Sequence, residues 1–146
     1  MRRALALLFL PLAVAHADQW LGVRHDGGLS THELERLLAE HPLREQENIK
    51  AVPITASTHV KQLLVQVRDR EPLHYHADSD LTVFLLRGKG EIEINGERRR
   101  VAAGDVIHIP RRAVHAYINR GPEIGVAFVV MSPPPGPDDR VLVPAQ

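Results

Sequence analysis

The chain has 146 residues and 44% hydrophobic content, the size and apolar fraction of one compact domain. Its eighteen basic residues balance eighteen acidic ones and form no basic stripe, so the electrostatic signature of a nucleic-acid-binding protein is missing. Without cysteine, disulfides and thiolate zinc sites are excluded, and a metal would have to be held by histidine, carboxylate or water.

Residues 1–17 have the pattern of a signal peptide. Arg2 and Arg3 supply the positive start, residues 4–14 form a short apolar core, and the sequence 15–17 (Ala-His-Ala) matches the small-residue pattern that signal peptidase cuts. The apolar core is shorter than the ~20 residues that cross a bilayer, so we expect no transmembrane span. The sequence thus predicts an exported protein, periplasmic or secreted, whose mature chain begins after residue 17.

Residues 18–48 are expected to form an N-terminal extension that carries one short helix. The first part of this extension is rich in turn-forming residues. A helix over about 30–41 is predicted because Ser30 and Glu33 match the S-x-x-E capping box. One face of that helix is apolar and consists of Leu34, Leu37 and Leu38.

Residues 49–143 change to short β-branched runs separated by turn residues, which predicts an all-β domain with a closed or double-sheet architecture. The Asn95-Gly96 pair predicts a tight hairpin, because a type I′ turn needs positive φ at both central positions. Phe84 and Phe128 are expected in the core, and residues 138–143 are a candidate edge strand. The other candidate strands are 51–56, 60–68, 81–86, 91–94, 106–109, 115–118 and 125–131.

The candidate functional residues begin with His74-Tyr75-His76. Alternate side chains of an extended strand point to the same face, so this pair would place two imidazoles side by side. That spacing alone is weak evidence of a metal site, but a second set of residues strengthens it. About forty residues further along the chain come Gly104, Pro110, His115 and Asn119.

The order and spacing of these residues resemble the cupin superfamily, whose two motifs are G(x)5HxH(x)3,4E(x)6G and G(x)5PxG(x)2H(x)3N. The second motif is matched by Gly104, Pro110, His115 and Asn119, with Arg112 in place of the middle glycine. The first is matched by His74, His76 and Gly88. The resemblance covers roughly residues 58–131 and implies a double-stranded β-helix, or jelly roll, with a central cavity.

The resemblance also implies a divalent metal ion bound by His74, His76 and His115. The glutamate of the first motif has no exact counterpart. A gap of three residues after His76 leads to Asp80, whereas the gap of six residues before Gly88 leads to Leu81, which cannot bind a metal ion. Two alternatives stay open: Asp80 supplies a carboxylate, or the site consists of three histidines with open positions. Imidazole ligands favour zinc, iron, manganese, nickel or copper over calcium or magnesium.

Three functions are compatible with such a site. The first is a metal-dependent enzyme, such as an oxygenase, decarboxylase or isomerase, that acts on a small molecule. The second is a non-catalytic barrel that holds a small ligand, and the third is a metal-handling protein of the cell envelope.

Tyr117 shares a strand face with His115 and is expected to line the cavity. The resemblance is also compatible with a homodimer.

Overall fold

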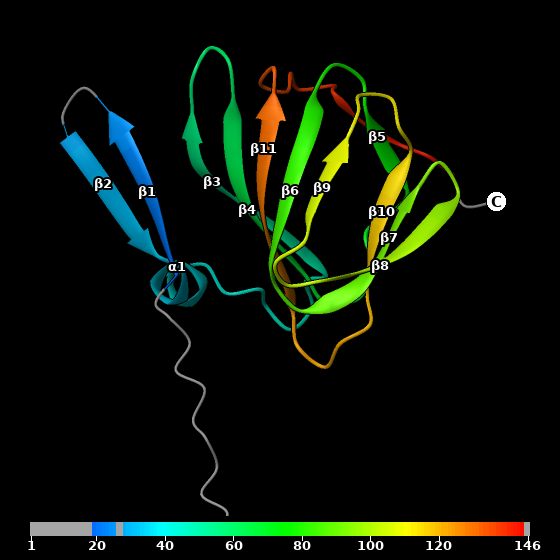
Figure 1. Cartoon of the computed structure of the whole chain (residues 1–146), viewed down its shortest axis with the longest axis horizontal. Helices are drawn as coiled ribbons and strands as arrows, with labels where there is room; N and C mark the ends of the chain where they lie inside the picture. The colour runs from blue at the N-terminus through cyan, green and yellow to red at the C-terminus, as the bar shows by residue number, and fades with distance from the viewer. Residues whose placement is uncertain (1–18, 26–27, 145–146) are drawn as a thin grey trace, which may run out of the picture. The chain divides into compact units, whose positions relative to one another are not determined.

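The computed structural model describes residues 19–25 and 28–144, and the predicted signal peptide therefore lies outside the described residues (Figure 1). The chain divides into two compact units, 1–40 and 41–146. The first unit holds an antiparallel hairpin and one helix. Its elements are β1 (Trp20–His25), β2 (Gly28–Glu33) and α1 (Leu34–Glu40).

The helix of the first unit begins later than the capping box predicts. Ser30 lies in β2 opposite Val23, so it belongs to a strand and does not cap a helix. Pairing along the hairpin continues to Glu33, and α1 starts at the next residue. The local S-x-x-E signal was therefore overridden by strand pairing across the hairpin. The leucine face is confirmed, since Leu34 and Leu37 are buried.

The second unit is built from two five-stranded sheets whose neighbouring strands are all antiparallel (Figure 1). In the first sheet the order is β3 (Ile49–Ala56), β4 (Lys61–Val67), β11 (Gly125–Ser132), β6 (Asp80–Arg87) and β9 (Val106–Ile109). In the second it is β12 (Arg140–Leu142), β5 (His74–His76), β10 (His115–Asn119), β7 (Lys89–Ile94) and β8 (Glu97–Ala102). The predicted all-β jelly roll is confirmed.

The Asn95-Gly96 hairpin joins β7 to β8 as the sequence predicts. Asn95 has φ of 49° and Gly96 has φ of 84°, so both central residues adopt the positive φ that a type I′ turn requires. The edge strand expected within residues 138–143 is also present, as β12, which pairs with β5. This pairing brings the end of the chain beside the two histidines of β5.

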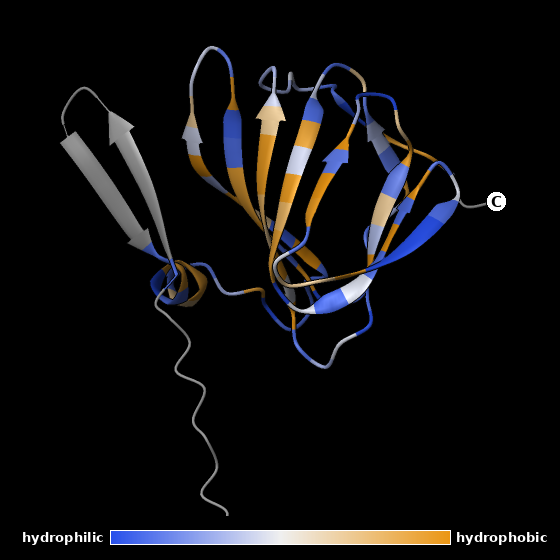
Figure 2. Cartoon of the chain, in the orientation of Figure 1, coloured by the Kyte–Doolittle hydropathy of each residue, from blue (hydrophilic) through white to orange (hydrophobic). Residues whose placement is uncertain are grey.

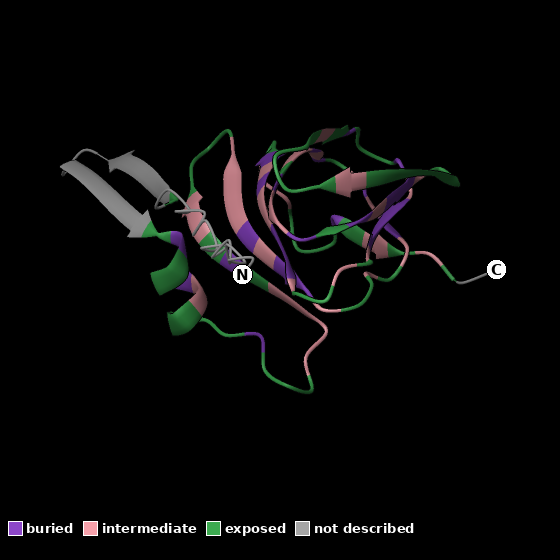
Figure 3. Cartoon of the chain, turned by 60° about the horizontal axis from the view of Figure 1, so that its bottom comes forward, coloured by how far each residue is buried: buried purple, intermediate pink, exposed green. Residues whose placement is uncertain are grey.

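Alternation along the strands divides the residues between the interior and the outside of the barrel. Figure 2 shows apolar segments on most strands of the barrel, whereas β8 is mainly hydrophilic. Figure 3 shows that the buried segments of the barrel lie on its strands. The side chains of the three central strands of the first sheet, β4, β6 and β11, that line the interior are Leu63, Val65, Val67, Leu81, Val83, Leu85, Ala127, Val129 and Met131.

Phe84 and Phe128 do not belong to this interior set. Phe84 is 37% exposed and its ring centroid lies 6.1 Å from that of Phe128. Val83 and Leu85, the neighbours of Phe84, line the cavity, so Phe84 itself points outward. The core assignment was wrong because these strands are apolar on both faces, and composition alone does not reveal which set faces inward.

No helix in the described part of the chain is long and apolar enough to cross a membrane.

Candidate metal centre

Strand pairing brings His74, His76 and His115 together at one end of the barrel. β5 lies between β10 and β12, and His74 pairs directly with His115. The ring centroids of His74 and His115 are 4.3 Å apart, and those of His76 lie 5.3 Å from His74 and 5.7 Å from His115. One ligand nitrogen from each ring lies within 4.8 Å of the others. The three predicted histidines therefore form one compact cluster.

Two of these rings are oriented by the carbonyl group two residues earlier in the chain. His74 Nδ1 lies 2.8 Å from the Pro72 carbonyl oxygen, and His115 Nδ1 lies 2.9 Å from that of Ala113. A carbonyl oxygen only accepts hydrogen bonds, so Nδ1 of each neutral ring carries the proton. The lone pair of each ring is then on Nε2, the nitrogen left for a metal ion.

The third ring is oriented by a buried carboxylate. His76 Nδ1 lies 2.6 Å from Oδ2 of Asp139, which is 2% exposed. The other oxygen of Asp139 accepts the backbone N–H groups of Asp78 at 2.8 Å and Ser79 at 3.1 Å. Although burial raises the pKa of Asp139, these N–H groups and His76 lower it below its usual value. Asp139 therefore stays ionised and holds His76 in the same tautomer as the other two histidines.

Burial also keeps His74 and His115 uncharged. It lowers the pKa of His74 and that of His115 to about 4, against the smaller opposing effect of their carbonyl hydrogen bonds. Both rings are therefore neutral near pH 7, and neutral imidazole is the form that binds a metal ion. His74 and His115 are each 3% exposed and His76 is 8% exposed. The cluster thus offers three lone pairs in a site largely shielded from solvent.

The turn before His115 departs from the family motif at one residue. Arg112 stands where the motif has glycine, and its φ of 65° lies in the left-handed region that favours glycine. Its backbone N–H donates to the His76 carbonyl oxygen at 2.6 Å, which ties the turn to β5. The turn is therefore preserved despite the substitution.

Asp80 is not part of the histidine cluster. Its carboxylate accepts the backbone N–H of Arg111 at 2.8 Å and pairs with the Arg111 guanidinium at 3.3 Å. These hydrogen bonds hold the pKa of Asp80 below its usual value. Leu81, the next residue, lines the cavity, so strand alternation turns Asp80 away from it. The carboxylate of Asp80 is therefore directed toward Arg111, and Asp80 is absent from the described group of residues that could hold a metal ion.

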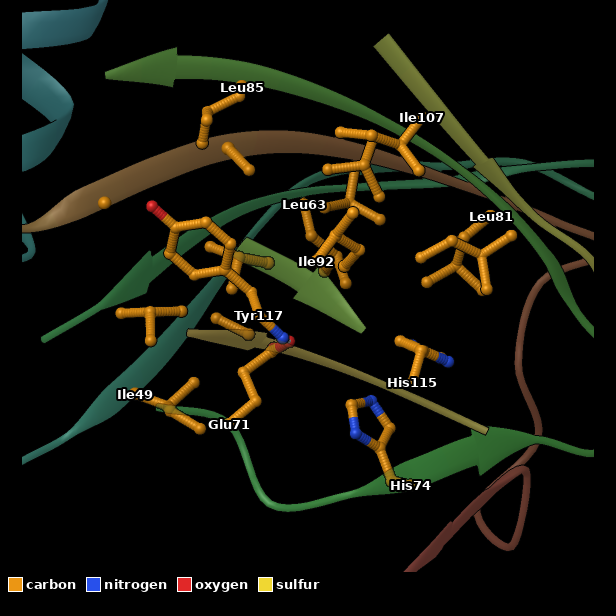
Figure 4. A pocket seen from close by; sticks show the side chains of 18 of the residues that line it. Ile49, Leu63, Glu71, His74, Leu81, Leu85, Ile92, Ile107, His115 and Tyr117 are labelled. Atoms are coloured by element: carbon orange, nitrogen blue, oxygen red, sulfur yellow. The ribbon is translucent and has the colours of Figure 1, made fainter. Parts of the chain in front are cut away.

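The histidines open onto a cavity of about 400 Å³ inside the barrel (Figure 4). Its walls are mainly aliphatic, and Figure 4 shows Tyr117 across the cavity from His74 and His115. The structure therefore places Tyr117 on the lining, as expected. The charged residues of the described lining are Glu71 and Arg140.

Sequence reasoning missed Glu71, which lies three residues before His74. Glu71 Oε2 accepts the backbone N–H of Tyr117 at 3.0 Å, and the Glu71 N–H donates to the Tyr117 carbonyl oxygen at 2.9 Å. These two bonds hold the Glu71 carboxylate beside the cavity. Neither family motif places an acidic residue at this position, so the sequence held no signal for it.

Comparisons with known proteins agree with this fold. A family model described as a cupin domain matches residues 63–131. An uncharacterized protein of Aquifex aeolicus is 35% identical over 111 residues, which cover 76% of this chain and 90% of that protein. Quercetin 2,3-dioxygenase of Bacillus subtilis is 39% identical over 49 residues, 34% of this chain and 14% of the dioxygenase. An uncharacterized Klebsiella pneumoniae protein with a double-stranded β-helix domain has a similar structure, with TM-score 0.63, 19% identity, and coverage of 74% of this chain and 95% of that one.

Proposed function

The chain belongs to the cupin superfamily, and from this membership we propose that its barrel holds one divalent transition-metal ion and presents it to a small molecule in the cavity. The proposed ligands are Nε2 of His74, His76 and His115. The observation that carries the proposal is that all three Nδ1 atoms face hydrogen-bond acceptors, which leaves all three Nε2 lone pairs for a metal ion.

The donor set suits the ions that the sequence suggested. Three neutral imidazoles favour zinc, iron, manganese, nickel or copper, and three protein ligands leave coordination positions open for water or another small ligand. When bound, such an ion would polarise an oxygen of the small molecule as a Lewis acid. Open positions that face an apolar cavity support ligand binding at the metal more than a purely structural role for it.

The proposal is tested by titrating the untagged protein, stripped of metal, with each of the five ions in turn. We expect binding of one ion per chain, together with a rise in the unfolding temperature, because a ligand bound only by the folded state stabilises that state. The matched control is His59→Ala, which removes an exposed histidine. His115→Ala should lose the binding and His59→Ala should keep it. Equal binding by both variants would contradict the proposed site.

A catalytic role is a second candidate, and Glu71 is the observation that favours it. Glu71 places a carboxylate on the lining of the cavity that the histidines share, where it could accept or return a proton of a metal-bound molecule. The Bacillus subtilis protein that matches part of this chain is named as a dioxygenase, which is compatible with metal-dependent chemistry in the same fold.

The enzymatic candidate can be tested with Glu71→Gln. The metal-loaded protein would be incubated with a panel of aromatic enols and carboxylic acids, and products would be sought by mass spectrometry. Turnover that disappears in Glu71→Gln while metal content is unchanged would support catalysis. Turnover that persists in the variant would exclude Glu71 as the proton-transferring group, and no turnover on any substrate would favour the non-catalytic barrel.

We also propose that the protein is exported, because residues 1–17 have the positively charged start, the short apolar core and the cleavage pattern of a signal peptide. The buried histidine cluster is better suited to retaining a metal ion than to passing it on, so of the envelope functions we favour ligand binding over metal handling. Sequencing of the mature N-terminus from cells tests export. We expect a start at Asp18, and an intact Met1 would contradict it.

A further inference from the structure

A short strap, residues 138–143, lies beside the histidine cluster near the red end of the chain in Figure 1. It contains β12, which is at the edge of the second sheet and has β5 as its one neighbouring strand in the described part of the chain. Four of the five residues that lead into the strap, 133–137, are prolines, which have no backbone N–H to donate to a sheet. The strap is therefore attached to the barrel along one side.

The strap buries very little of its own surface. Asp139 is the one buried residue among residues 132–144. Arg140 is exposed, and Leu142 is 59% exposed, so β12 contributes almost no apolar surface to the core. Segments with few buried apolar contacts open at a lower free-energy cost than the rest of a domain. The strap is thus the element beside the cluster that is best suited to open while the barrel stays folded.

The carboxylate of Asp139 fastens the strap and orients His76 at the same time. The strap is also held by two backbone bonds, from the N–H of Ala77 to the Asp139 carbonyl oxygen at 2.8 Å and from the N–H of Val143 to the Leu73 carbonyl oxygen at 2.9 Å. An open strap takes the carboxylate away from His76. Because coupling between two binding events is reciprocal, a metal ion on His76 and the docked strap stabilise each other by the same factor.

Two paths lead a metal ion to the histidines, which are at most 8% exposed. The path through the cavity is lined mainly by aliphatic side chains, and the charges of Glu71 and Arg140 oppose each other there. A divalent ion loses its hydration on that path without gaining a partner, which is unfavourable. The path past the strap leads along carboxylates, that of Asp139 and that of the exposed Asp78, whose backbone N–H is bonded to Asp139. The charges therefore favour entry past the strap.

Resting on the proposed metal site, we propose that the strap is a gate for the metal ion. It opens to admit or release the ion, and the bound ion holds it closed through His76 and Asp139. In the open state His76 lacks the carboxylate that keeps the proton on Nδ1, so the ion is bound less tightly and leaves. In the closed state the ion is retained.

A disulfide between the strap and β5 tests the gate. Tyr75 and Val141 pair directly, and both point away from the cavity because the residues beside them line it. Opposed residues of antiparallel strands have Cα atoms about 4.5–5.5 Å apart, within the range of about 4.4–6.8 Å that disulfides span. Tyr75→Cys with Val141→Cys can form one disulfide within the chain, which has no other cysteine. The matched control is Glu91→Cys with Arg100→Cys, an outward-facing pair that joins β7 to β8.

Release of zinc to an excess of chelator would be compared before and after reduction by a phosphine. In the strap variant we expect release to be about tenfold or more slower in the oxidised form, with zinc affinity unchanged because entry and release are slowed alike. The control variant should release zinc at the same rate in both forms. Equal rates in the strap variant, or a similar slowing in the control, would overturn the gate alone. Failure of the wild-type protein to bind zinc would overturn the metal site itself and the gate with it.

Hydrogen exchange measures the opening of the strap directly. The N–H groups of Ala77 and Val143 report on it, because both are bonded between the strap and β5 or its flanking residues. In the metal-free protein we expect them to exchange about tenfold or more faster than the amides of β11, which is paired on both sides, and we expect zinc to slow them. Protection equal to that of β11 in the metal-free protein, or exchange that zinc leaves unchanged, would overturn the gate.

Discussion

Replacement of Asp139 by asparagine tests how the histidine cluster is prepared for metal. Oδ1 of Asp139 accepts two backbone N–H groups, so the amide oxygen of an asparagine would take that place. Its NH2 group would then face Nδ1 of His76, where the carboxylate oxygen now lies at 2.6 Å. Two donors would oppose each other unless the proton of His76 moved to Nε2, the nitrogen needed by the metal ion.

The expected cost is a large loss of metal affinity in a protein that still folds. Loss of a hydrogen-bond partner of a metal-bound histidine typically lowers metal affinity by about 10- to 100-fold. Because the asparagine would also favour the wrong tautomer, we expect the upper end, about 100-fold, which corresponds to about 2.7 kcal/mol. The control is Asp138→Asn, which makes the same change of charge at an exposed neighbouring residue. Competition titration against a chelator gives both affinities.

Wild-type affinity in folded Asp139→Asn would show that the carboxylate does not set the tautomer of His76. An equal loss of affinity in Asp138→Asn would do the same, since net charge would then explain the effect. Circular dichroism of the metal-free variants establishes that both are folded.

Three further predictions concern the site and the barrel. Asp80→Ala should leave metal affinity within about twofold of wild type in a chelator competition, and a tenfold loss would restore Asp80 as a ligand. Burial lowers the pKa of His74 and His115 to about 4, so between pH 6.5 and 4 the unfolded chain binds more protons than the folded chain. The metal-free protein should therefore lose stability as the pH falls through this range, by up to about 1.4 kcal/mol per pH unit for each histidine. Urea unfolding should show this slope, and His74→Gln should reduce it; an unchanged slope in the variant would contradict the assignment. Gly90→Ala should destabilise the barrel by about 1–3 kcal/mol, because its Cβ would clash with the backbone carbonyl oxygen of Ile118 and with the ring of Tyr117. Gly136→Ala, whose Cβ would meet nothing within 4 Å, should be nearly neutral in thermal unfolding.

The sequence predicted the parts of the site that depend on local spacing. His74 and His76 alternate on one strand, and His115 follows a recognisable turn, so strand geometry and family resemblance together were enough to group them. The Asn95-Gly96 turn was predictable for the same reason, because its backbone requirement is met by two adjacent residues.

The parts that the sequence did not predict depend on contacts between distant segments. Asp139 reaches His76 across 63 positions of the chain, and no spacing rule links them. Glu71 owes its place to the backbone of Tyr117, which lies on another strand. The capping box at Ser30 gave a local helix signal that pairing in the hairpin overrode. Export and the homodimer stay predictions.

The most direct test of the metal centre is anomalous scattering from crystals of the metal-loaded protein, measured at the absorption edge of the bound ion. We expect one strong peak per chain, at coordination distance from Nε2 of His74, His76 and His115, which is about 2.0–2.1 Å if the ion is zinc. The carboxylate of Asp80 should not contact the ion. A peak elsewhere, or an ion bound through Nδ1 of any of these histidines, would contradict the proposed metal centre.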